Sequence, residues 1–263
     1  MSTSNKAFIA SLVFSIASII LVFMFGGEPP AGSAPMAEGF KTPILALEFA
    51  RSLEDLAFLQ GRDAAALRAN LMRVQSLDQY FPIAYAGMAA LFFFALVLRG
   101  NKLAWIAVAL AVATILADWV ENQSVDSIIA FSGLYSCEPI VDSEAEFCIF
   151  IEENLMPSVH APPSQYPGEA DRQNRLQEAL PVLTLTTWIK WGLIAGYGAM
   201  MALLMIRDKR RILALPSAAA SLAILATYLS GSSGQMAEII LMTMPAFMLS
   251  FPIAAVMYLR SAN

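Results

Sequence analysis

Histidine, cysteine and charged residues are all scarce in this chain of 263 residues. It has one histidine and two cysteines, and only 14% of its residues are charged, whereas a soluble domain has about 25%. So few nitrogen and sulfur ligands exclude Cys/His zinc sites, four-cysteine iron–sulfur clusters and bis-histidine haem ligation. Any metal ion would therefore be held by oxygen. The net charge of -5, without a basic stripe, also excludes a nucleic-acid partner.

Apolar residues are what the chain has in excess, with 58% hydrophobic residues and a mean hydropathy of +0.62. A helix needs roughly 20 mostly apolar residues to cross the hydrocarbon core of a bilayer. Six stretches meet this requirement: residues 7–25, 80–98, 103–120, 183–206, 212–230 and 237–259. The sequence therefore predicts an all-α integral membrane protein with a six-helix transmembrane bundle.

The basic residues predict the orientation of these spans. With the N-terminus in the cytoplasm, the inner side has one acid, Asp208, and eight basic residues, namely Lys6, Arg99, Lys102, Arg207, Lys209, Arg210, Arg211 and Arg260. The positive-inside rule then places both termini in the cytoplasm, and we expect the bacterial inner (plasma) membrane as the location. The first apolar stretch is longer than the core of a usual signal peptide, so we expect it to remain as an anchor.

The spans divide the chain into five parts. Residues 1–25 form the first anchor, 26–79 an extracytoplasmic linker with helices, 80–120 spans two and three, 121–182 an acidic extracytoplasmic loop, and 183–263 spans four to six. The acidic loop contains Cys137 and Cys148. Because cysteine pairs outside the cytoplasm are usually oxidised, we predict a structural disulfide in a small, helical extracytoplasmic region.

Four ionisable residues lie at or within the predicted spans. Asp78 precedes span two, Asp118 and Glu121 end span three, and Lys190 lies about two turns into span four. A charged side chain at membrane depth costs about 2.5–3.5 kcal/mol on insertion scales, so it usually faces a partner or water. Asp118 and Glu121 share a helix face, with Asn122 beside them. We predict that Lys190 lies within salt-bridge reach of Asp78, Asp118 or Glu121.

These charges occur in recognisable motifs. The motifs are Leu77-Asp-Gln-Tyr-Phe-Pro-Ile-Ala-Tyr-Ala86, Ala117-Asp-Trp-Val-Glu-Asn122 and Ile189-Lys-Trp-Gly192, preceded by Ala46-Leu-Glu-Phe-Ala50. In them the chain resembles a group of uncharacterised bacterial multi-pass inner-membrane proteins with an Asp-x-x-Glu-Asn motif closing one span and a Lys-aromatic pair in the next. The resemblance covers residues 43–206 and implies no activity. It implies that six residues belong together: Glu48, Asp78, Asp118, Glu121, Asn122 and Lys190.

Three interpretations of these six residues stay open. They could form an interhelical ion-pair network that fixes packing, a site for a ligand or a hard cation such as Ca²⁺, or a catalytic centre. Catalysis has the least support, because the sequence shows no Ser/His or Cys/His pair and no metal-hydrolase motif. Apart from such a cation, we expect no cofactor, and we lean against an enzyme.

Two classes of function fit this sequence. We favour a non-enzymatic accessory, assembly or interaction component of a membrane complex, whose outer parts bind a membrane or periplasmic protein. The alternative is a small transporter, or a protein that binds a cation or small molecule, using the charged residues.

Overall fold

The computed structural model describes residues 1–26, 29–32, 34–60, 62–133 and 169–261, and none of these residues forms a β-strand. Within these ranges, six helices are long and apolar enough to cross a membrane, which confirms the predicted all-α, multi-pass class. The long helices are α1 (Thr3–Phe25), α3 (Ala65–Asp78) followed by α4 (Phe81–Leu98), α5 (Ala104–Gly133), α7 (Glu169–Arg207), α8 (Arg211–Leu229) and α9 (Gly234–Arg260).

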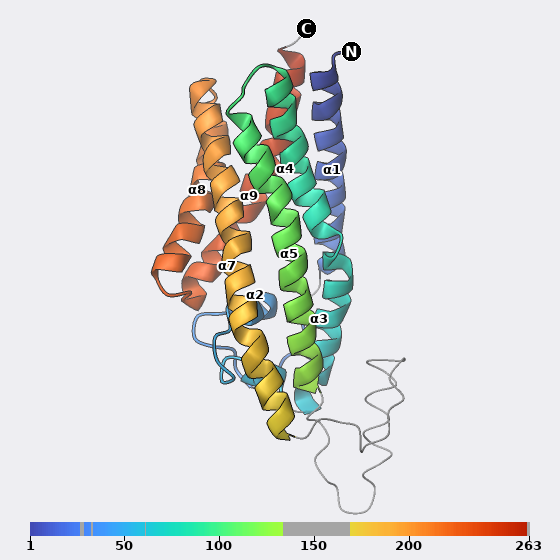
Figure 1. Ribbon diagram of the computed structural model, residues 1–263, viewed down its shortest axis with the longest axis vertical. Helices are drawn as coiled ribbons and strands as arrows, with labels where there is room; N and C mark the ends of the chain where they lie inside the picture. The colour runs from blue at the N-terminus through green and yellow to red at the C-terminus, as the bar shows by residue number, and fades with distance from the viewer. Residues whose placement is uncertain (27–28, 33, 61, 134–168, 262–263) are drawn as a thin grey trace, which may run out of the picture.

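These helices close into a ring. Each of α1, α4, α5, α7, α8 and α9 packs against the next, and α9 returns to α1. Both termini lie at the same end of the bundle, as an even number of crossings requires (Figure 1). Helix α3 is separated from α4 by only Gln79 and Tyr80, so the two together make one long rod beside α1 and α5.

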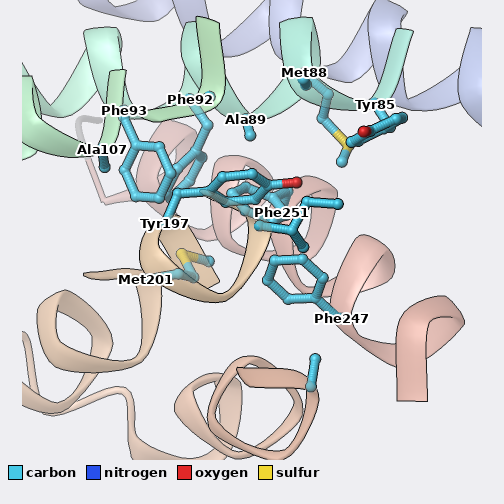
Figure 2. Close-up of a cluster of buried hydrophobic side chains, with 14 of the residues drawn as sticks. Tyr85, Met88, Ala89, Phe92, Phe93, Ala107, Tyr197, Met201, Phe247 and Phe251 are labelled. Carbon is cyan, nitrogen blue, oxygen red and sulfur yellow. The ribbon is translucent and has the colours of Figure 1, made fainter. Parts of the chain in front are cut away.

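Aromatic side chains fill the centre of the ring. Phe92 and Phe93 of α4, Tyr197 of α7, and Phe247 and Phe251 of α9 are all buried there (Figure 2). The ring centroids of Phe93 and Phe251 are 5.7 Å apart, and those of Tyr197 and Phe247 are 5.8 Å apart. Aromatic pairs at such distances contribute about 0.5–1.5 kcal/mol beyond their buried area. The centre of the bundle is therefore a packed core.

A second hydrophobic core lies at the end of the molecule opposite the termini, where α3, α5 and α7 extend past α8 and α9 (Figure 1). We call this part the distal module and define it as residues 36–60, 62–78, 122–133 and 173–183. It includes the short helix α2 (Pro43–Glu48) and two single 3₁₀ turns, η1 (Ala57–Leu59) and η2 (Arg62–Ala64). Its core is made of apolar residues from four segments: Leu47, Leu56, Phe58, Leu59, Leu67, Leu71, Val125, Ile128, Ile129, Leu176, Leu180 and Leu183.

Helix α5 is longer than predicted, because it continues 13 residues past residue 120 to Gly133. Val125, Ile128 and Ile129 recur at helical spacing in this extension and are buried in the core of the distal module. They pack with apolar residues of α3 and α7, so these contacts bury the extension of the helix. Cys137 and Cys148 lie outside the described residues, and the disulfide between them stays a prediction.

Candidate functional site

The six predicted residues lie where the two hydrophobic cores meet, and we refer to Glu48, Asp78, Asp118, Glu121, Asn122 and Lys190 as the charged cluster. They come from α2, the end of α3, the middle of α5 and the middle of α7. Glu121 is fully buried, and Lys190 is only 5% exposed. The cluster has Trp191 of the bundle core on one side and Val125 of the distal core on the other.

Lys190 is the centre of the charged cluster. Its Nζ is 3.2 Å from Oε1 of Glu48, and it also pairs with Oε2 of Glu121, one of the three carboxylates expected as its partner. The ammonium lies 5.1 Å from the ring centroid of Trp191, within range of a cation–π interaction. Lys190 on α7 is therefore bound to both α2 and α5 by buried ion pairs.

Neutral hydrogen-bond donors also contact the two glutamates that pair with Lys190. Thr187 lies one turn before Lys190, and its hydroxyl is 2.5 Å from Oε1 of Glu121 and 3.2 Å from the backbone oxygen of Glu48. The indole nitrogen of Trp191 donates to Oε2 of Glu48 at 3.3 Å. Thr187 was not predicted as part of the site, although its spacing of three residues from Lys190 places both on one helix face.

Glu238 of α9 holds α2 in place, and it too was missing from the predicted set. Its carboxylate accepts hydrogen bonds from the backbone nitrogens of Lys41 and Thr42, both at 2.8 Å, and from the Thr42 hydroxyl at 3.0 Å. A six-residue helix cannot persist by itself, so its position depends on such contacts. Because Glu48 is the last residue of α2, Glu238 indirectly sets where Glu48 meets Lys190.

The remaining members of the cluster lie beside Lys190 without pairing with it. Tyr85 of α4 donates a hydrogen bond to Oδ2 of Asp118 at 2.6 Å. Asp78 is half-buried and interacts electrostatically with Asp118, Glu48 and Lys190. Within the described part of the chain, neither aspartate forms an ion pair with Lys190.

The Asn122 amide lies against Asp78, but the two side chains make no hydrogen bond of normal geometry. Nδ2 of Asn122 is buried and has no partner among the described residues, and the same is true of Nε2 of Gln75, one turn before Asp78 on α3. The structure therefore brings Glu48, Glu121 and Lys190 into direct contact. The other three predicted residues, Asp78, Asp118 and Asn122, surround this contact.

A metal ion was one expectation for the cluster. Among the residues that the structure describes, no group of three or more His, Cys, Asp or Glu side chains could hold one. The physical reason lies at Lys190, whose ammonium occupies the position between Glu48 and Glu121 that a cation would take. A Ca²⁺ site at the cluster stays a prediction.

Comparison of the chain with protein-family models, with curated proteins and with solved structures gives no match. The resemblance to a group of uncharacterised multi-pass membrane proteins therefore also stays a prediction.

Proposed function

We propose that this membrane protein is a non-enzymatic accessory or assembly component of a membrane complex, and that its distal module is the surface that binds the partner. The observation that carries the proposal is the junction between the two cores. The module has a hydrophobic core of its own, and the ion pairs of Lys190 join α2 of this module to α5 and α7.

A buried ion pair suits this role because it fixes geometry more than it adds stability. Removing two charges from water costs several kcal/mol per ion, and their attraction repays this only when the geometry is good. The pairs of Lys190 with Glu48 and Glu121 hold the module in one orientation relative to the bundle. A fixed orientation lowers the entropy cost of docking on a partner.

The packed bundle disfavours the alternative of a transporter. Secondary transporters bind substrate near the middle of the membrane, often where helices are discontinuous. Here the middle of the ring is filled by Phe92, Phe93, Tyr197, Phe247 and Phe251 (Figure 2). Lys190 is already paired with two carboxylates, so it offers no free charge to an incoming anion.

Photocrosslinking in intact cells tests the docking role. A photoreactive residue would replace Ser52 or Glu54, which are exposed on the distal module, and a matched control would replace Leu222, which is exposed on α8. We expect one and the same protein to be crosslinked from Ser52 and from Glu54, and not from Leu222. Crosslinks to lipid alone from both module positions, or an equal yield of that protein from Leu222, would overturn the proposal.

We infer in addition that both termini face the cytoplasm of a bacterium. Basic side chains support this inference, because they are also packed into the end of the bundle that holds the termini. Arg99 donates to the backbone oxygen of Tyr258 at 3.1 Å, and the Arg210 guanidinium lies 4.1 Å from the centroid of the Tyr258 ring.

Cysteine labelling tests this orientation, in a variant whose two native cysteines are replaced by serine. Ser233 and Lys209 are exposed at opposite ends of α8 and serve as a matched pair of sites. A membrane-impermeant maleimide should label Ser233→Cys in spheroplasts, and Lys209→Cys only after the membrane is permeabilised. The reverse pattern would invert the topology.

A further inference from the structure

We propose that the charged cluster is also a proton-binding site, in which Asp78 holds one exchangeable proton beside a buried water molecule that accepts a hydrogen bond from Asn122. The proposal goes beyond docking and does not depend on it. It arises from two features that the ion pairs of Lys190 leave unexplained.

The first feature is the balance of charge. Among the described residues, four carboxyl groups, those of Glu48, Asp78, Asp118 and Glu121, face a single ammonium, that of Lys190. Both glutamates pair directly with Lys190, so the two aspartates are left without a cation of their own. An uncompensated charge in a low-dielectric place is costly enough that the group usually becomes neutral instead.

Within the part of the chain that the structure describes, no second cation compensates the charge of Asp78. The charged groups that act on it are Asp118 of α5, Glu48 of α2 and Lys190 of α7, of which two are acids. Tyr85 gives one hydrogen bond to Asp118, which stabilises that aspartate as an acceptor but adds no charge. This difference favours Asp78 as the residue that carries the proton. Asp78 is also only half-buried, which leaves a short route for exchange with solvent.

The second feature is the unpartnered amide of Asn122. This residue is 6% exposed, its Nδ2 has no hydrogen-bond partner among the described residues, and its side chain lies against Asp78. A buried donor without a partner calls for an ordered water or ion. An N–H group repels a cation, whereas a water molecule can accept from it and donate to a carboxylate. Asn122 and Asp78 supply two of the two to four polar partners that a buried water needs.

In the proposed site the proton is bound and released without other chemistry. A proton from solvent adds to a carboxylate oxygen of Asp78, and the neutral acid then donates a hydrogen bond to the water. On release, the same O–H bond breaks and the proton returns to solvent. No oxidant, reductant or metal ion takes part.

Infrared difference spectroscopy of the full chain in lipid nanodiscs tests the proposal. A protonated carboxylic acid has a C=O stretching band that ionised carboxylates lack, and the band shifts in heavy water. We expect the wild-type protein to show such a band near neutral pH, to lose it reversibly on alkaline titration, and to lose it in Asp78→Asn. Asp63→Asn is the matched control, because Asp63 is an exposed aspartate of the same module. Asn122→Leu should keep the band but shift its frequency, because the water loses one partner.

The possible results separate the proton from other occupants. A wild-type protein without any band sensitive to pH would overturn the proposal, and this measurement needs no variant to fold. A band that survives in Asp78→Asn would place the proton elsewhere and overturn it as well. Calorimetric binding of Na⁺ or Ca²⁺ by the wild-type protein, lost in Asp78→Asn, would assign the site to a cation and contradict the proton.

Discussion

The bundle core and the charged cluster are both buried, but different interactions stabilise them. In the bundle core, aromatic side chains such as Phe92, Tyr197 and Phe251 touch several neighbours, and none depends on one partner. In the cluster, Glu48, Glu121 and Lys190 depend on one another, because each would be an unpaired buried charge without the others. Substitutions in the bundle core should therefore cause local and additive losses of stability, whereas the losses caused by substitutions in the charged cluster should be coupled.

The largest expected effect comes from Lys190→Met. Breaking a buried ion pair by removing one partner typically costs about 3–5 kcal/mol, because the remaining charge stays buried. Thermal unfolding of the purified protein in detergent should therefore show a sharp loss of stability. Adding Glu121→Gln should restore part of this loss, since the double variant removes a charge that Lys190→Met leaves unpaired. Simple addition of the two single effects would contradict the proposed coupling.

Glu238→Ala should have a smaller and more local effect. The change removes the acceptor of three hydrogen bonds to Lys41 and Thr42, and unsatisfied donors of this kind cost about 1–3 kcal/mol each when buried. Lys41 and Thr42 are only partly buried, so we expect the lower end of that range for the whole variant. Hydrogen exchange should speed up in residues 41–48 and stay unchanged in α4. Faster exchange throughout α4 would show that Glu238 supports the bundle rather than α2.

Phe247→Leu should have an effect about as small as that of Glu238→Ala, but in the bundle core. We expect a loss of about 1 kcal/mol, typical of a moderate volume change among packed side chains. Phe247 packs on Tyr197 and Phe251 and shares no partner with Lys190. The double variant with Lys190→Met should therefore be additive to within about 0.5 kcal/mol. A larger deviation in a thermal unfolding series would mean that core and cluster are one cooperative unit.

The sequence alone was sufficient for the helical class and the membrane spans, because both follow from local composition. It also predicted that Lys190 pairs with Asp78, Asp118 or Glu121, since a charged residue within an apolar span must find a partner, and the structure shows that the partner is Glu121. It could not reveal Glu238 as the support of α2. Glu238 and Thr42 are 196 residues apart in the chain, and nothing local to either one predicts that they meet.

The length of α5 shows a second limit. Residues 121–133 are polar enough to be taken as part of a loop, and the burial of Val125, Ile128 and Ile129 is understood only when α3 and α7 lie beside them. The same holds for Tyr85, which in the sequence is one more aromatic residue of span two. Its hydroxyl is recognised as part of the site only when the structure places Asp118 opposite it. Tertiary contacts, rather than local propensity, decide these features.

Hydrogen exchange in Lys190→Met tests whether the charged cluster fastens the distal module to the bundle. The backbone amides of α2 and of residues 49–59 should lose most of their protection, while those of α4 and α9 in the bundle keep theirs. Equal loss of protection in α2 and α4 would contradict this local role, because the charged cluster would then stabilise the whole protein. Unchanged protection in α2 would contradict it as well, because the module would then be held without Lys190.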